Sequence, residues 1–254
     1  MSDLSAFSLA GKRILLTGAN TGIGQGIAVS IARAGGVVIG VGRSSMEETA
    51  HRVSEAGGQF EAVAADLADT AAAGSMLDRV WQDSGPLDGL VNNAGIIRRA
   101  DAVELTQADW DEVIDVNLKT VFLLCQSFAR RVLAGGRRGK IVNIASVLSF
   151  QGGIRVASYT ASKHGVLGIT RLLACEWAAK GINVNGIAPG YIETNNTQAL
   201  RDDPDRSAAI LGRIPAGRWG EPGDIGDAAV FLLAPASNYM HGAVMPVDGG
   251  WLAR

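Results

Sequence analysis

Several features that mark other classes of protein are scarce in this sequence. Its 254 residues include only two cysteines, Cys125 and Cys175, which have no CxxC spacing and lie in apolar stretches typical of helices. We therefore expect buried thiols and no disulfide. The three histidines, His51, His164 and His241, are scattered without metal-ligand spacing. No metal site is predicted.

An excess of charge and long apolar runs are also lacking. The chain has 23 Lys and Arg against 25 Asp and Glu, a net charge of −2. Such a balance offers no electrostatic footprint for nucleic acid or an anionic membrane. No apolar run approaches the ~20 residues that cross a bilayer, and the N-terminus lacks the pattern of a secretory signal. We expect no nucleic-acid or membrane partner and a cytoplasmic location.

What the chain has is an alternation of apolar, β-rich runs with longer amphipathic stretches. Strands are expected at Arg13–Thr17, Val37–Val41, Phe60–Ala64, Gly89–Asn92, Lys140–Ala145, Asn183–Ala188 and Ala243–Val247. Helices are expected at Ile23–Ala34, Met46–Ala56, Thr70–Ser84, Thr106–Gly135, Ser158–Lys180 and Ile225–Ala234. The pattern predicts an α/β fold, a Rossmann-type, doubly wound, parallel seven-stranded sheet with helices on both faces. Without a linker or an internal repeat, residues 1–254 are expected to form a single dinucleotide-binding catalytic domain.

One segment departs from this alternation. Glu193–Trp219 has weak helical periodicity, no strand and two prolines. A long insertion near the end of a compact sheet is often a lid or a substrate loop, and a decorative loop is the alternative.

A glycine-rich loop follows the first expected strand. The glycines at 18, 22 and 24 form Gly-x-x-x-Gly-x-Gly, one residue longer than the usual dinucleotide fingerprint. Between a strand and a helix, such a loop lets backbone N–H groups approach a pyrophosphate. The sequence therefore predicts nucleotide binding at this junction.

The second expected strand ends without the carboxylate that usually holds a ribose 2′-hydroxyl. Arg43 is the only charge there. A guanidinium at this point favours a 2′-phosphate and hence NADP, although it can also stack on the adenine or remain solvated. Asp66 follows the third strand and Asn92–Gly95 ends the fourth, where both could contact a nucleotide.

The pair Tyr159 and Lys163 is the strongest indication of chemistry. A spacing of four residues on a helix puts a phenol and an ammonium on one face. A cation about 4 Å away would lower the pKa of the tyrosine toward the operating pH, as general acid–base catalysis requires. Ser146 directly follows the strand Lys140–Ala145 and is expected at the edge of the sheet where ligands bind.

In order and spacing, these motifs resemble the short-chain dehydrogenase/reductase family from Leu9 to Trp251. The matching motifs are Thr17–Gly24, Asp66, Asn92–Gly95, Asn117, Ser146, Tyr159 with Lys163, Pro189-Gly190 and Thr194. The resemblance implies a catalytic tetrad of Ser146, Tyr159, Lys163 and Asn117. It also implies cofactor contacts from Gly18, Asn20, Thr21, Gly22, Ile23, Gly24, Arg43, Asp66, Leu67, Asn93, Ala94, Gly95, Tyr159, Lys163, Pro189, Gly190, Ile192 and Thr194.

The family resemblance further implies a role for each member of the tetrad. Ser146 would donate a hydrogen bond to the substrate oxygen while Tyr159 exchanges its proton. Lys163 and the positive nicotinamide ring would lower the pKa of Tyr159, and Lys163 would also hold the ribose hydroxyls. Asn117 would anchor a water that links Lys163 to solvent.

Cationic and amide side chains surround the expected site. They are Arg98, Arg99, Gln151, Arg155, Asn195 and Asn196. Arginine binds carboxylates bidentately and amides suit sugar hydroxyls, so a small polyhydroxylated acid is the predicted substrate. Arg98 or Arg155 is expected to hold the carboxylate, and Ser146, Gln151, Tyr159 and Asn195 are expected to contact the rest.

Several stretches also resemble a narrower group of the family, the 2-dehydro-3-deoxy-gluconate 5-dehydrogenases, also known as 2-deoxy-gluconate 3-dehydrogenases. They are Ala94–Arg99, Ser149–Arg155, Ala188–Thr197, Ile214–Gly220 and Val247–Arg254. This resemblance implies oxidation of a deoxy sugar acid in the breakdown of pectin-type uronates, NAD with NADP as the alternative, and a homotetramer. The alternatives are an NADPH-dependent reductase of another carbonyl, such as a 3-ketoacyl thioester, and a cofactor-binding redox sensor.

Overall fold

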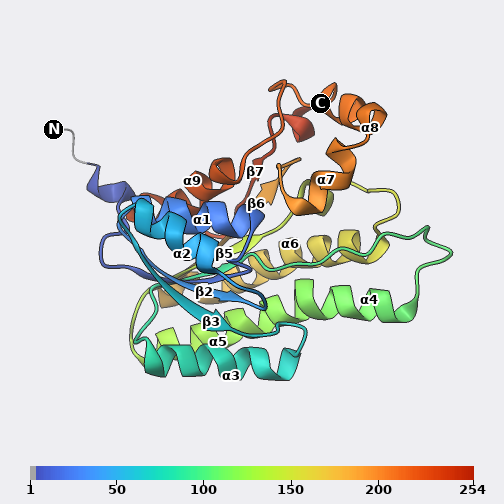
Figure 1. Ribbon diagram of the computed structural model, residues 1–254. Coiled ribbons are helices and arrows are strands. Elements are labelled where there is room, and N and C mark those ends of the chain that lie inside the picture. The colour runs from blue at the N-terminus through green and yellow to red at the C-terminus, as the bar shows by residue number, and fades with distance from the viewer. Residues whose placement is uncertain (1–3) are drawn as a thin grey trace.

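The computed structural model describes residues 4–254, and its centre is one parallel sheet (Figure 1). The strands are β1 (Arg13–Thr17), β2 (Val37–Gly42), β3 (Gln59–Ala64), β4 (Gly89–Asn92), β5 (Gly139–Ile144), β6 (Ile182–Pro189) and β7 (Val244–Val247). Their order across the sheet is β3-β2-β1-β4-β5-β6-β7, and each neighbouring pair is parallel. The predicted doubly wound, seven-stranded sheet is confirmed.

Helices cover both faces of this sheet. The main helices are α1 (Gly22–Arg33), α2 (Glu47–Glu55), α3 (Thr70–Asp83), α4 (Gln107–Ile114), α5 (Thr120–Ala134), α6 (Ala157–Trp177), α7 (Asn195–Arg201), α8 (Pro204–Leu211) and α9 (Pro222–Leu233). In Figure 1, α1, α2 and α9 lie on one face, and α3, α5 and α6 lie on the other. Within residues 4–254, no helix combines the length and the apolar character that a bilayer span requires.

Successive apolar residues of a strand pack into two separate hydrophobic cores, one on each face of the sheet. In β1, Ile14 and Leu16 pack in the core that includes Ile27 of α1, whereas Leu15 packs in the core that includes Leu77 of α3. Because side chains alternate across a strand, a continuous apolar run is what a sheet buried on both faces needs. This is why the runs read from the sequence coincide with the strands.

The helix predicted over Thr106–Gly135 is interrupted. Helix α4 ends at Ile114, a π-helical turn spans Asp115–Lys119, and α5 begins at Thr120. Such turns occur within otherwise regular helices, often at functional sites. A π-helical turn adds one residue to the helix, and the apolar pattern of the sequence shows no break at that point. The sequence therefore did not indicate this turn, which contains Asn117.

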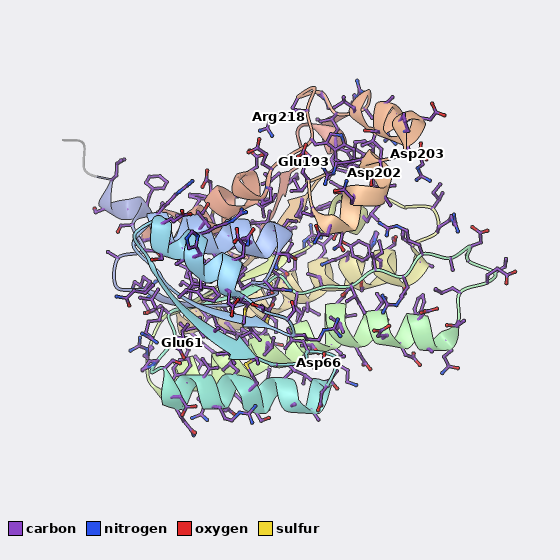
Figure 2. All side chains as sticks on the ribbon, in the orientation of Figure 1. Glu61, Asp66, Glu193, Asp202, Asp203 and Arg218 are labelled. Atoms are coloured by element: carbon purple, nitrogen blue, oxygen red, sulfur yellow. The ribbon has the colours of Figure 1, made fainter. Side chains whose placement is uncertain are left out.

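The segment 193–219 contains two short helices, α7 and α8. Asp202 and Asp203 lie between them (Figure 2). The Asp203 carboxylate accepts hydrogen bonds from the backbone N–H groups of Asp205 and Arg206, and Pro204 follows it as the first helical residue. Asp followed by Pro is a common start of a helix, but the weak apolar periodicity of this segment led us to expect no helix here.

The two cysteines differ in their surroundings. Cys125 is buried in the sheet–helix core, as expected, whereas Cys175 is exposed. The expectation of a buried thiol is therefore wrong for Cys175. On α6 the preceding residues Leu173 and Ala174 take the buried face, so Cys175 points to the outer face of the same helix.

Candidate active site

A cavity of about 440 Å³ lies at the carboxyl ends of the strands, where the order reverses between β1 and β4. This is the position at which doubly wound sheets bind ligands. The predicted residues that line it are Gly18, Asn20, Thr21, Gly22, Ile23, Gly24, Arg43, Asp66, Leu67, Asn93, Ala94, Gly95, Ser146, Tyr159, Lys163, Pro189, Gly190, Ile192, Thr194 and Asn195. Tertiary structure thus brings seven segments of the sequence to one cavity.

The glycine loop leaves little room for side chains. Gly18 has a φ of +67°, and a Cβ atom built on Gly24 would lie 1.9 Å from the Gly18 carbonyl oxygen. Thr21, at the start of α1, makes no side-chain capping hydrogen bond, so the first N–H groups of the helix face the cavity without a side-chain partner. A helix start of this kind is suited to a pyrophosphate.

The turn after β4 is tied to this loop. The Thr17 hydroxyl accepts hydrogen bonds from the backbone N–H groups of Asn93 and Ala94, both at 3.0 Å. The Asn93 amide donates to the carbonyls of Thr17 and Gly18 at 3.0 and 3.1 Å. Asn93 therefore holds two walls of the cavity together.

Where β2 and β3 end, Arg43 and Asp66 both line the cavity. The Arg43 guanidinium is 3.8 Å from the Asp66 carboxylate, and both side chains are more than half exposed. Figure 2 shows Asp66 beyond the end of β3. Asn20 donates to the Ser44 hydroxyl at 2.7 Å. An exposed pair of this kind is weak, so Arg43 can turn to a ligand at little cost.

Tyr159 and Lys163 of α6 lie next to Ser146. The Lys163 ammonium is 5.5 Å from the centre of the Tyr159 ring and donates to the Ile144 carbonyl at 2.6 Å. Ser149 donates its hydroxyl hydrogen to the Lys163 carbonyl and accepts from the Ser146 backbone N–H. The end of β5 and the start of α6 are thereby locked in register.

The pKa values of these groups differ from the sequence-based expectation. Burial raises the pKa of Tyr159, and the opposing effects of the Ser146 hydroxyl and the Arg99 charge are smaller. Burial also lowers the pKa of Lys163 to about 8. Without a cofactor, desolvation therefore dominates the pKa of Tyr159, and the expected lowering by Lys163 together with a bound nicotinamide ring stays a prediction.

Asn117 lies in the π-helical turn and is fully buried. Its side chain exchanges two hydrogen bonds of 2.8 Å with the backbone of Ile96, and its amide also donates to the Ser162 hydroxyl at 3.3 Å. Asn117 is therefore behind the cavity wall, where it connects the Ile96 loop to α6. Its predicted role toward a water stays a prediction.

The arginines differ from the predicted arrangement. Neither Arg98 nor Arg155 lines the cavity: Arg98 pairs with Glu112 at 2.7 Å and Asp109 at 3.5 Å, and Arg155 pairs with Asp101 at 3.1 Å. Nearby carboxylates thus neutralise both. Gln151 is also outside the lining.

Arg99 is also outside the lining, but its charge is in a different situation from that of Arg98. Among the residues that the structure describes, no carboxylate is within ion-pair distance of it, and its charge acts on Tyr159. Its guanidinium donates at 3.1 Å to the carbonyl of Asn196, which lines the cavity. The sequence alone could not show which of the two adjacent arginines is available to a substrate carboxylate, because that depends on acidic residues elsewhere in the chain.

Sequence reasoning missed some lining residues. They are Gly42, Ser44, Ala65, Ala68, Ile96, Glu112, Val116, Ile144, Ala145 and Thr197. Most are neighbours of predicted residues. Glu112 is the exception: it is five residues before Asn117 on α4, and only the packing of α4 brings it to this wall.

Comparisons with known proteins cover nearly the whole chain. The family model described as "Enoyl-(Acyl carrier protein) reductase" matches residues 18–252. A protein of Dickeya dadantii named 2-dehydro-3-deoxy-D-gluconate 5-dehydrogenase is 54% identical over 251 residues, 99% of each chain.

Solved structures match equally well. A protein from Agrobacterium tumefaciens, described as a 2-deoxy-D-gluconate 3-dehydrogenase with bound NADP, is 60% identical with a TM-score of 0.93 and covers 98% and 99% of the two chains. A Beutenbergia cavernae protein, described as an NAD(P)-dependent gluconate 5-dehydrogenase with bound NADP, is 51% identical with a TM-score of 0.94 over 98% and 100% of the chains.

Proposed function

Because the chain belongs to the short-chain dehydrogenase/reductase family, we propose that it oxidises a secondary hydroxyl of a deoxy sugar acid, such as 2-dehydro-3-deoxy-D-gluconate. The carrying observation is the Arg99 guanidinium, which has no acidic partner in the described part of the chain and which donates a hydrogen bond at 3.1 Å to the carbonyl of Asn196 at the cavity wall. A carboxylate on the substrate would form an ion pair with this guanidinium. Relatives named as sugar-acid dehydrogenases support the same substrate class.

A nicotinamide cofactor, when bound, supplies the hydride acceptor. Tyr159 would remove the proton of the substrate hydroxyl, provided that the positive charges of Lys163 and of a bound nicotinamide offset the burial that raises its pKa, and Ser146 would donate a hydrogen bond to the same oxygen. Lys163, with a pKa of about 8, is mostly protonated at neutral pH and adds positive charge beside the phenol. Segment 193–219 covers the bound substrate, since Asn195, Asn196 and Thr197 line the cavity.

The substrate class is tested with Arg99→Ala. Wild-type protein should oxidise 2-dehydro-3-deoxy-D-gluconate, and the variant should raise KM about 10–100-fold, because a hydrogen-bonded charge contributes about 1.5–3 kcal/mol. Arg155→Ala, which removes a cation already paired with Asp101, is the matched control and should stay within about threefold. Initial rates followed by cofactor absorbance give both constants.

Two results would contradict the proposed substrate class. If the wild type leaves sugar acids untouched but reduces a 3-ketoacyl thioester with NADPH, the substrate class is wrong. Tight cofactor binding without turnover on any alcohol would favour the redox-sensor alternative.

For the cofactor we propose that NADP is accepted, with Arg43 on the 2′-phosphate. The edge of the cavity at β2 carries Arg43 and Ser44 and no carboxylate, and the 60% identical relative was solved with NADP. This replaces the preference for NAD that the narrower resemblance had favoured.

Arg43→Ala tests this assignment. We expect kcat/KM for NADP to fall about 10–100-fold while the value for NAD changes less than about threefold, because only NADP carries the phosphate. Arg52→Ala, on the exposed face of α2 and paired with Glu48, serves as the control. Equal losses with both cofactors would contradict the role given to Arg43.

A homotetramer, as in the family, is also proposed. The helices α5 and α6 carry partly exposed apolar side chains, Leu133 and Leu172, that an interface between subunits would cover.

A further inference from the structure

Glu112 is the one acidic side chain of α4 at the cavity wall. It lines the same cavity as Ser146, Tyr159 and Asn195, whereas Asp109 and Asp111 of the same helix do not. Its side chain is 38% exposed. None of the groups that bind the cofactor or move the proton uses this carboxylate, so it needs a separate explanation.

Arg98 holds this carboxylate from behind. One guanidinium nitrogen is 2.9 Å from one Glu112 oxygen and 2.7 Å from the other. Arg98 is itself restrained by Asp109 at 3.5 Å and by its hydrogen bond to the Ile97 carbonyl at 3.2 Å. A carboxylate fixed in this way keeps lone pairs on both oxygens, and it can accept hydrogen bonds but cannot donate them.

We propose that Glu112 is a specificity-determining residue that accepts hydrogen bonds from substrate hydroxyls other than the one oxidised, and that Arg98 positions it. The assignment rests on the proposed function, which supplies a substrate with several hydroxyls and one carboxylate. Arg99 has no acidic partner in the described part of the chain, so the substrate carboxylate lies toward Arg99, and the hydroxyl-bearing end lies toward Glu112, whose oxygens keep lone pairs although Arg98 pairs with them. The two charges thereby select one orientation of the substrate.

The same carboxylate discriminates against aliphatic substrates. An acyl chain over Glu112 would remove water from the carboxylate without offering a hydrogen bond, which is unfavourable. Sites built to bind a hydroxyl reject analogues that lack it more strongly than apolar pockets reject an extra one. The cavity therefore favours polyhydroxylated acids over fatty acyl thioesters.

The test compares two acids on Glu112→Ala. The first is 2-dehydro-3-deoxy-D-gluconate, and the second is 5-hydroxy-2-oxohexanoate, which keeps the carboxylate and the reacting hydroxyl but lacks the other two. We expect kcat/KM for the first to fall about 30–100-fold and for the second to change less than about threefold. Glu112→Gln, which retains one acceptor oxygen, should lose about 5–10-fold on the first acid.

Controls separate a specific role from a structural one. Asp111→Asn, on the exposed side of α4, should leave both acids within about twofold. Arg98→Met should raise KM for the hydroxylated acid with little change in kcat, and adding it to Glu112→Ala should cost almost nothing more, because both act through one contact.

Two failures can be told apart. If the wild type oxidises the sugar acid and Glu112→Ala keeps the full preference for it, the Glu112 assignment is wrong and the proposed function stands. If the wild type oxidises no sugar acid, the proposed function fails and takes this assignment with it.

Discussion

Replacing Tyr159 with Phe is expected to reduce turnover about 10³–10⁴-fold. The phenol hydroxyl is the group in this cavity positioned by α6, beside Ser146 and Lys163, to exchange a proton with a substrate hydroxyl. General acid–base catalysis contributes up to about 10⁴-fold, and Phe keeps the ring while removing the proton acceptor. Stopped-flow or steady-state rates with saturating cofactor measure the loss.

Cofactor binding should hardly change in the same variant. The glycine loop, the Asn93-Ala94 turn and Lys163 are untouched, so the dissociation constant for NADP should stay within about threefold in a fluorescence titration. Tyr239→Phe, at a fully exposed tyrosine, is the control and should behave as wild type. A loss of cofactor binding as large as the loss of turnover would mean that Tyr159 is a binding residue and not the base.

Replacing Lys163 with Met is expected to abolish most activity and yet stabilise the fold. Lys163 is 4% exposed, and burial lowers its pKa from 10.5 to about 8. At neutral pH the protonated ammonium therefore costs up to about 3 kcal/mol of folding free energy. Met fills similar volume without a charge. We expect a gain of about 1–2 kcal/mol, since the bond to the Ile144 carbonyl is lost, and a fall in kcat of about 10²–10³-fold.

The pH dependence of this gain has a definite sign. Between about 8 and 10.5 the folded protein binds fewer protons at Lys163 than the unfolded chain does, so wild-type stability rises with pH through this group. The advantage of Lys163→Met is thus full at neutral pH and shrinks as the pH approaches 10.5. Chemical denaturation at neutral pH and near pH ~9.5 measures it, with the exposed Lys180→Met as the control. A variant less stable than wild type at neutral pH would refute the argument.

A gain in stability together with a loss of activity in Lys163→Met would reflect a conflict between stability and function. A lysine beside a phenol is useful to catalysis because it is partly desolvated, and the same desolvation weakens the fold. The Ser149–Lys163 and Ser146–Ser149 hydrogen bonds, which join β5 to α6, hold the lysine in place against this cost.

Much of the fold and part of the site could be predicted from sequence alone. Apolar runs such as Arg13–Thr17 identified the strands, because a sheet covered on both faces needs side chains that are apolar in both directions. The glycine loop and the Tyr159–Lys163 pair each span only a few residues. Their geometry is set by neighbours in the chain, so both could be predicted from the sequence. The π-helical turn at Asp115–Lys119 was not predictable, since the apolar pattern runs through it unchanged.

The sequence by itself determined the doubly wound sheet, the position of the glycine loop at its first junction and the pairing of a phenol with an ammonium on one helix. Only the tertiary structure decided which arginine has an acidic partner and which carboxylate faces the cavity: Arg98 is neutralised by Glu112 and Asp109, whereas Arg99 pairs with no carboxylate in the described part of the chain. It also decided that burial raises the pKa of Tyr159. The physical reason is that charge neutralisation and desolvation depend on residues far apart in the chain, whereas periodicity and spacing depend on residues within a few turns of one another.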